Sequence, residues 1–227
     1  MKTKNLHTLL IKSDMKQKVK SIFFMILIFL TYWLGMSFLS ALLFFVLHSF
    51  VLSGFVAVVV FSIPFLYLLY KKTGINFTDH KTPDESTRFP LWRLLCIGIL
   101  LAAITQIYVY LFPSFEKENV NLTKKDITFS AMSNLLAAPI AEELFGRKWA
   151  VSYLEKANVK PVYILVITSF LFFIVHTSYM PLYFRFDTLL SGAVLYYIYI
   201  RYHDVRYCIF IHFIINLIAT SNFFANH

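Results

Sequence analysis

A stretch of this chain as long as two membrane crossings contains no charged residue. Between Ser21 and Tyr70 there is no Asp, Glu, Lys or Arg, and only 15% of the 227 residues are charged while 59% are hydrophobic. A soluble domain is close to half apolar and about a quarter charged. The composition therefore excludes an ordinary soluble globule and predicts a polytopic membrane protein.

Other features are also scarce or missing. The net charge is +9, but the basic residues flank apolar runs and form no stripe or arm, so they indicate membrane topology and no nucleic-acid partner. The two cysteines, Cys96 and Cys208, lie in apolar runs without metal or redox spacing, which predicts buried, unreactive thiols. The motifs H-E-x-x-H, G-x-S-G and G-x-G-D, which mark three known classes of protease, are absent, as is a glycine-rich phosphate loop.

The apolar runs predict an all-α bundle of about seven membrane spans, seven or eight in number. Because about 20 apolar residues cross the hydrocarbon layer, the uncharged stretch must hold two spans with a break near His48-Ser49. The first run follows a lysine-rich segment, but its length predicts a retained anchor and not a signal peptide. The predicted spans are 21–46, 50–70, 91–113, a helix starting near 127, 161–178, 186–201 and 206–223, with polar loops at 71–90 and 114–126.

The Lys and Arg residues are distributed unevenly between the two sides of this bundle. If the N-terminus is inside, most of the 21 Lys and Arg fall in inner segments. The outer segments then hold Lys117, Lys124, Lys125 and Arg185. This asymmetry follows the positive-inside rule and predicts a cytoplasmic N-terminus, whereas the side of the C-terminus depends on the span count.

A few polar side chains lie within the predicted spans. Ionisable groups at this depth cost free energy and usually face the bundle interior or a wet cavity. Glu143 and Arg147 are four residues apart and can pair on one helix face. Glu142 lies about 100° around the helix with no basic residue three or four positions later, so it is the free carboxylate that can accept a proton. The full set of candidates is Glu142, Glu143, Arg147, His176, Asp187, His212 and Asn216.

Two further helices can bring histidines toward Glu142. If the helix near 127 continues to a turn at Asn158-Val159, Glu142 and His176 both lie 17 residues from Val159. Both would then sit about 25 Å from the turn, at similar depth. His212 and Asn216 share a helix face and could together donate hydrogen bonds to an oxyanion. Counting from the preceding turn places His212 shallower than Glu142, unless the helix carrying Glu142 extends well into the cytoplasm.

Each of these residues also has a purely structural interpretation. Glu143 with Arg147 can be a buried ion pair, and His176, His212 and Asn216 can be hydrogen bonders between helices. Asp187, next to Arg185, fits the outer end of the span at 186–201. A second buried carboxylate without a partner has no packing benefit, however, and the combination of carboxylate, histidine and histidine–amide on three helices favours a functional site.

Three motifs in this order resemble one family. E-E-x-x-x-R ("EELFGR", 142–147), F-x-x-x-H ("FFIVH", ending at His176) and H-x-x-x-N ("HFIIN", 212–216) are similar to the CPBP or Abi family, which groups CAAX-type prenyl proteases with bacteriocin-processing and immunity-associated membrane proteins. The resemblance covers residues 127–223 as a catalytic helix core. Residues 1–126 are then an N-terminal cytoplasmic segment and variable transmembrane helices with their loops.

The resemblance implies an intramembrane endopeptidase in the lipid bilayer of a bacterial cell membrane. Its substrate would be a membrane-embedded or membrane-associated peptide or protein, as in CAAX-type, pheromone or bacteriocin processing. Glu142 with His176 would activate a water, and His212 with Asn216 would stabilise the oxyanion, while Glu143 and Arg147 organise the helix. Members are labelled metalloproteases, so Glu142, His176 and His212 could hold Zn²⁺, although activation of water by glutamate and histidine needs no metal.

Two alternatives belong to other functional classes. A non-catalytic relative could keep the fold as an immunity or scaffold protein. A small transporter or channel could use the buried charges as an ion path, but the chain has no internal repeat or paired broken helices of the transporter kind. Many relatives carry a further span after the last motif, so the resemblance is compatible with seven or with eight spans.

Overall fold

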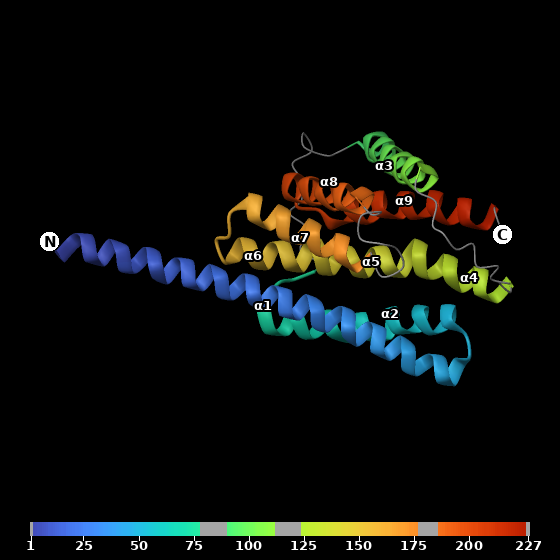
Figure 1. Ribbon diagram of the computed structural model, residues 1–227, viewed down its shortest axis with the longest axis horizontal. Coiled ribbons are helices and arrows are strands. Elements are labelled where there is room, and N and C mark those ends of the chain that lie inside the picture. The colour runs from blue at the N-terminus through green and yellow to red at the C-terminus, as the bar shows by residue number, and fades with distance from the viewer. Residues whose placement is uncertain (1, 78–89, 112–123, 177–185, 226–227) are drawn as a thin grey trace.

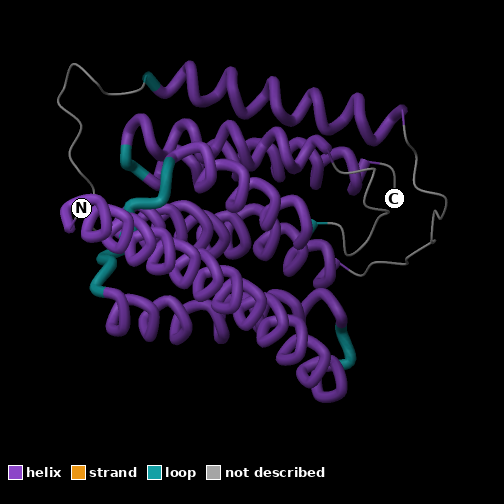
Figure 2. The backbone as a smooth tube through the Cα atoms, turned by 60° about the vertical axis from the view of Figure 1, so that its left-hand side comes forward, coloured by secondary structure: helices purple, strands orange, loops and turns teal. Residues whose placement is uncertain are grey.

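The structure is a computed structural model that describes residues 2–77, 90–111, 124–176 and 186–225. Throughout these ranges the regular elements are helices, and the helices run side by side as a bundle (Figures 1 and 2). The prediction of an all-α fold is confirmed, with no strand in the described ranges.

The first two helices form a long antiparallel hairpin. α1 spans Lys2–Leu47 and α2 spans Phe50–Thr73. His48 has a positive φ of 50°, and the Ser49 side chain caps α2 by accepting a hydrogen bond from the Leu52 amide at 3.2 Å, so the predicted break is confirmed. α1 begins well before the apolar run at 21–46 because residues 2–20 contain no Pro or Gly and are rich in the good helix formers Lys and Leu.

The helix that carries the glutamates is longer than the apolar run suggests. It runs without a break from Lys124 to Lys156, so residues 124–126 of the predicted polar loop are helical. Two π-helical segments interrupt its α-helical geometry, one on each side of the glutamates. The consecutive pieces are α4 (Lys124–Met132), η2 (Ser133–Ala137), α5 (Ala138–Glu143), η3 (Leu144–Val151) and α6 (Ser152–Lys156).

The remaining helices complete the bundle. A tight turn with Asn158 at a φ of 54° follows α6, so the predicted hairpin turn is confirmed. The helix predicted at 161–178 ends at Val175, and residues 177–178 lie outside the described residues. The last helix pair turns at His203, also at positive φ. The bounds are α3 Leu91–Leu111, α7 Pro161–Val175, α8 Phe186–Tyr202 and α9 Val205–Ala225.

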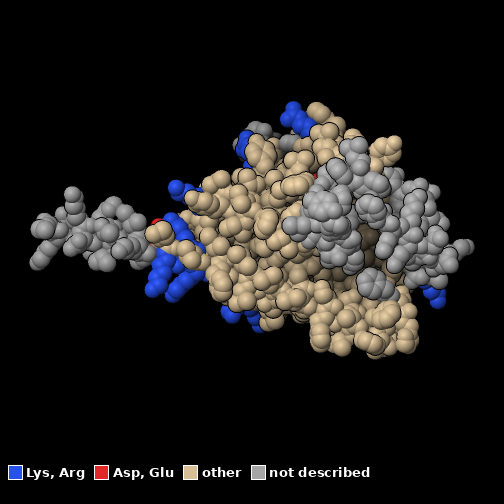
Figure 3. All heavy atoms as spheres, in the orientation of Figure 1, with Lys and Arg blue, Asp and Glu red and all other residues tan. Residues whose placement is uncertain are grey.

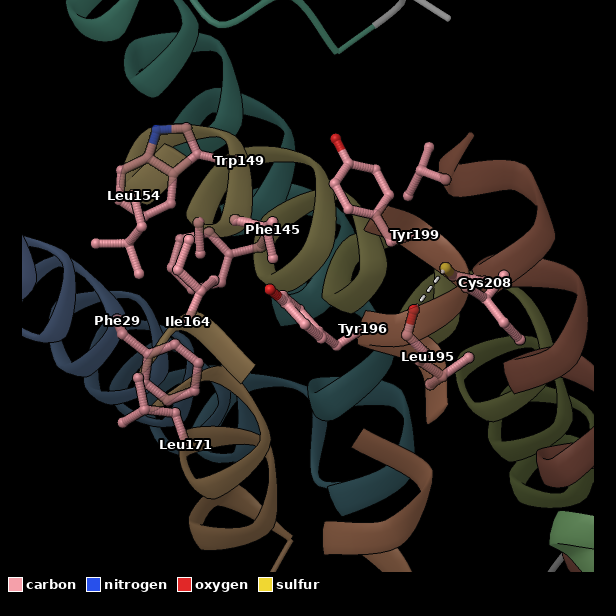
Figure 4. Packing of buried hydrophobic residues seen from close by; sticks show 14 of the residues in the cluster. Phe29, Phe145, Trp149, Leu154, Ile164, Leu171, Leu195, Tyr196, Tyr199 and Cys208 are labelled. Atoms are coloured by element: carbon pink, nitrogen blue, oxygen red, sulfur yellow. Dashed lines mark hydrogen bonds between the residues drawn. The ribbon is translucent and has the colours of Figure 1, made fainter. Parts of the chain in front are cut away.

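An aromatic core fills the part of the bundle between the glutamates and the hairpin turn at 157–160. Phe145 and Trp149 stack with ring centroids 5.3 Å apart, and Tyr32 of α1 stacks on Phe145 at 4.5 Å. All three side chains are 1% exposed or less. Figure 4 shows Phe145 and Trp149 in this core together with residues of α1, α7 and α8.

The outward faces of the first two helices are strongly apolar. Asp14–Leu47 and Val51–Thr73 are long and apolar enough to cross a membrane, and only 17% of each apolar window is buried inside the protein. Large side chains such as Phe23, Leu34 and Phe45 lie on this exposed surface. A buried core helix would hide these groups, so this exposed apolar surface is typical of a membrane-spanning helix pair.

The two cysteines, both predicted to be buried, differ in their exposure. Cys208 is buried, and its thiol donates to the Leu195 carbonyl at 3.3 Å, as Figure 4 shows. Cys96 is exposed, so its predicted burial is wrong. It lies two residues before Gly98, which packs against Ile214 of α9, and two residues turn an α-helix by about 200°. Asp187 lies buried in the first turn of α8, and Arg185 lies outside the described residues.

Candidate active site

The hairpin of the long helix and α7 brings Glu142 and His176 together. Glu142 Oε2 lies 3.6 Å from His176 Nε2, and the two side chains are 13% and 24% exposed. His176 caps the C-terminus of α7. Its other ring nitrogen, Nδ1, lies 2.7 Å from the Phe172 carbonyl oxygen. A carbonyl can only accept, so Nδ1 carries the hydrogen and Nε2 is presented to the carboxylate.

Glu143 is the centre of a separate buried network. Its Oε2 lies 3.4 Å from Arg147 Nε, so the predicted i,i+4 pair is confirmed. Its Oε1 lies 2.9 Å from His212 Nδ1. The sequence predicted His212 near Glu142 but not this hydrogen bond to the next carboxylate, which depends on the rotation of α9; both His212 and Glu142 line the same cavity. Arg147 also donates to the Gly192 carbonyl of α8 at 3.5 Å.

The depth of His212 is explained by the length of the helix that carries Glu143. Glu143 lies 13 residues before Lys156, the end of α6, whereas His212 lies seven residues after Val205, the start of α9. The helix ending at Lys156 therefore extends about 9 Å further than α9 at this end of the bundle. The two side chains meet despite their unequal distances from the turns.

The ring of Phe172 contacts both the histidine of the Glu142–His176 pair and the network around Glu143. The ring lies 4.3 Å from the imidazole of His176 and 5.7 Å, edge-on, from that of His212, measured between centroids. The guanidinium of Arg147 stands over the same ring at 4.7 Å. Cation–π contacts of this kind stabilise a buried guanidinium. The phenylalanine of the F-x-x-x-H motif thus orients the histidine through its carbonyl and packs the network through its ring.

The backbone around the glutamates explains the position of Asn216. In the π segment the Ala138 amide donates to the carbonyl of Ser133, five residues back. The next such bond would join residue 139 to Asn134, but Pro139 has no amide hydrogen. The carbonyl of Asn134 instead accepts a hydrogen bond from Asn216 Nδ2 at 2.7 Å. One of the two amide hydrogens that were expected to serve an oxyanion is therefore used to join α9 to η2.

A cavity of about 930 Å³ connects these side chains. Glu142, His176, His212 and Asn216 all line it, so the structure brings the predicted set to one space. The opposite wall comes from α1 and α2, which sequence reasoning left out of the site. Small and hydroxyl-bearing residues of that wall are Ser37, Ser40, Ala41, Gly54 and Ala57.

The zinc ion that the resemblance implies would need several ligands from this site. Within the described ranges, no three His, Cys, Asp or Glu side chains lie close enough together to hold a metal ion. Glu142 and His176 are neighbours, but His212 directs Nδ1 to Glu143. This arrangement does not fit a three-ligand zinc site.

Comparison with known proteins supports the identification of these motifs. Residues 124–218 match the family model described as type II CAAX prenyl endopeptidase, Rce1-like. The chain is similar to the type II CAAX prenyl endopeptidases. This match begins at the first residue of α4, includes Glu142, His176, His212 and Asn216, and confirms the CPBP resemblance. Comparison with curated proteins and with solved structures gives no match.

In this endopeptidase-like segment, sequence reasoning missed two connections. The pairing of Glu143 with His212 has no local signal, because it depends on how α9 is rotated. The pairing of Asn216 with the Asn134 carbonyl has a weak sequence signal. Pro139 lies five residues after Asn134 and leaves that carbonyl without its π-helical donor.

Proposed function

We propose that the protein is an intramembrane endopeptidase of the CPBP type, a hydrolase in which Glu142 and His176 activate a water. The observation that carries this proposal is the carboxylate–imidazole pair, 3.6 Å apart, on the wall of a 930 Å³ cavity inside an apolar bundle. The substrate is a peptide bond of a membrane-embedded or membrane-associated peptide or protein.

The two groups can share the proton transfers of hydrolysis. Glu142 Oε2 accepts no hydrogen bond from the residues that the structure describes, so it can accept one from a water molecule. As the water oxygen forms a bond to the scissile carbonyl carbon, its proton passes to the carboxylate. The C–N bond then breaks, and the leaving amine takes a proton through Glu142 or His176 Nε2.

His212 and Asn216 are proposed to stabilise the negative charge on the carbonyl oxygen. A doubly protonated His212 donates Nδ1–H to Glu143 and has Nε2–H left for the oxyanion. Asn216 uses one amide hydrogen for Asn134 and has a second one in the same cavity. Glu143 and Arg147 act as positioning residues, because Glu143 fixes the ring of His212.

The placement in the membrane is part of the same proposal. Seven helices are taken as spans of a bacterial cytoplasmic membrane, with the N-terminus in the cytoplasm. They are α1, α2, α3, the helix Lys124–Lys156, α7, α8 and α9. The basic residues near the ends of these helices support this orientation. The Zn²⁺ that the resemblance implies is no part of this proposal, and chelation tests whether cleavage depends on it.

A non-catalytic immunity or scaffold protein is the second candidate. The intact set of motif residues around one cavity favours the peptidase over it, because a scaffold needs no adjacent carboxylate and imidazole. An ion path through the bundle is a third reading, and loss of a liposome solute flux in Glu142→Gln would support it.

The test compares purified variants on a membrane peptide substrate. Glu142→Gln, His176→Ala and His212→Ala are expected to lose cleavage. The matched control is Glu155→Gln, an exposed glutamate in α6, which is expected to keep the wild-type rate. Cleavage that survives all three changes would disprove the catalytic assignment, and a cellular phenotype that survives them without any cleavage would favour the scaffold.

A further inference from the structure

The three tryptophans of the chain differ in how their indole N–H groups are placed. Trp92 is 61% exposed and lies beside Arg93 at the start of α3, as tryptophans do in the aromatic belts at membrane interfaces. Trp149 is buried, and its Nε1 donates to Thr73 Oγ1 at 3.3 Å. Trp33 Nε1 is buried as well, but it has no acceptor among the residues that the structure describes. An indole N–H can only donate, so an unused one inside a bundle costs free energy.

Trp33 lies in the uncharged middle of the bundle. It follows Lys20 by 13 residues in α1, which places it about 20 Å along the helix from that charge. Figure 3 shows most Lys and Arg side chains toward the end of the molecule where α1 begins, and a broad surface of uncharged residues over the middle. An apolar surface at this depth offers the N–H no acceptor, so its acceptor must lie in the interior of the protein.

Trp33 and Glu142 lie together at the boundary between two spaces. Both residues line the large cavity of about 930 Å³, and both also line a much smaller space between α1, the helix of the glutamates and α7. Apolar side chains form most of the wall of the smaller space, among them Phe29, Phe145 and Leu171, which Figure 4 shows close to one another. Its volume is about 10 Å³, which is about what a single water molecule needs.

The polar groups on this wall can serve a water molecule. Glu142 Oε2 is buried and, like Trp33 Nε1, has no hydrogen-bond partner in the described ranges. The guanidinium of Arg147 lines the same space, and Thr168 donates its hydroxyl hydrogen to the Ile164 carbonyl at 2.8 Å. A buried water makes about three hydrogen bonds to polar groups of the protein. The Trp33 N–H, the Glu142 oxygen and the Arg147 guanidinium together supply that number.

Gly146 keeps this space open. It is buried within η3 and lines the same wall. A Cβ at this position would meet no atom of another helix within 4 Å. Because the residue is buried, the room beside it lies inside the protein, and a side chain at this position would fill it.

We propose that the smaller space holds a water that accepts a hydrogen bond from Trp33 Nε1–H and donates one to Glu142 Oε2. The inference rests on the proposed function, in which Glu142 takes a proton from the attacking water. A water molecule has two hydrogens and two lone pairs. With one hydrogen on Glu142 and one lone pair on Trp33, the second lone pair is available for the scissile carbonyl carbon in the large cavity. Trp33 thus holds the reacting water in place and transfers no proton.

Two substitutions remove this water by different means. Trp33→Phe keeps an aromatic ring without the N–H, and we expect a roughly five- to thirtyfold lower kcat with a nearly unchanged KM. Gly146→Ala places a methyl group in the water space and should lower kcat at least as much. Its unfolding midpoint should stay at or above that of the wild type, since alanine is the better helix former. Trp92→Phe is the matched control at an exposed indole and should keep the wild-type rate.

NMR of the indole groups tests the water itself, whether or not cleavage is seen. The indole N–H signals of ¹⁵N-labelled protein in detergent are assigned from Trp33→Phe, Trp92→Phe and Trp149→Phe. We expect a nuclear Overhauser cross-peak between the Trp33 N–H and water, and its loss in Gly146→Ala. Trp149, whose N–H is bonded to Thr73, should show no such cross-peak.

Two results would overturn the inference. One is a Trp33 N–H without a water cross-peak in the wild-type protein. The other is an unchanged kcat in Trp33→Phe or in Gly146→Ala. A water cross-peak at Trp33 in a protein that cleaves no peptide would support the water site and refute the peptidase, so the two failures are distinguishable.

Discussion

Changing Glu143 to glutamine is expected to destabilise the protein strongly, whereas the same change at Glu142 is not. The two residues are neighbours in the chain but have different surroundings. Glu143 is fully buried and touches two groups that can carry positive charge, Arg147 at 3.4 Å and His212 at 2.9 Å. Glu142 is 13% exposed and has one imidazole at 3.6 Å.

The expected loss of stability depends on which groups each substitution leaves without a partner. Glu143→Gln leaves Arg147, 1% exposed, without a counter-charge, and breaking a buried ion pair in this way costs about 3–5 kcal/mol. The glutamine amide can keep one hydrogen bond to His212, which places the expected loss near the lower value. Glu142→Gln removes a carboxylate oxygen that has no hydrogen-bond donor in the described part of the chain, so we expect a change of less than about 1 kcal/mol.

Equilibrium unfolding in detergent with increasing SDS measures both variants against the wild type. The midpoint of Glu143→Gln should fall clearly, and that of Glu142→Gln should stay near the wild-type value. Equal stability of the two variants would refute the assignment of Glu143 as the structural carboxylate. A large loss in Glu142→Gln alone would mean that the two roles are exchanged.

Further changes probe the other contacts of the site. Phe172→Leu removes the ring between His176 and Arg147 but keeps the carbonyl that orients the imidazole. We therefore expect it to reduce the cleavage rate more than it reduces stability. The cleavage rate and the unfolding midpoint, each relative to wild type, check this expectation. Pro139→Ala restores an amide hydrogen opposite the Asn134 carbonyl, which competes with the hydrogen bond from Asn216 and should lower the cleavage rate. Asn216→Ala should lower the rate further, because it also removes the amide hydrogen proposed for the oxyanion, and an unchanged rate in Pro139→Ala would dismiss a role for the hydrogen bond to α9. Gly98→Ala puts a Cβ about 2.9 Å from the Ile214 side chain and should cost about 1–3 kcal/mol of stability by overpacking, measured by the same unfolding transition. Incubation with a strong chelator should leave cleavage unchanged, and a loss that Zn²⁺ restores would show that a metal is used.

Local spacing was enough to predict part of the site. The pairing of Glu143 with Arg147 is set by helix geometry within one turn, and the meeting of Glu142 with His176 is set by counting residues on both sides of one hairpin turn. Both depend on a single continuous helix from Lys124 to Lys156.

Contacts between helices far apart in the chain could not be predicted in the same way. Which glutamate His212 reaches depends on the rotation of α9 about its axis, and that rotation depends on packing, for example of Ile214 against Gly98. The cavity wall on α1 and α2 was missed because serines and small residues in an apolar run carry no signal of their own. They acquire a role only where the hairpin faces the glutamates.

The central claim is that Glu142 activates the water that cleaves a peptide bond. Its most direct test is the cleavage rate of a membrane peptide by purified Glu142→Gln protein whose unfolding midpoint matches the wild type. Loss of the general base is expected to lower the rate by about 10²–10⁴-fold, with Glu155→Gln at the wild-type rate. A Glu142→Gln enzyme that cleaves as fast as the wild type would contradict the account.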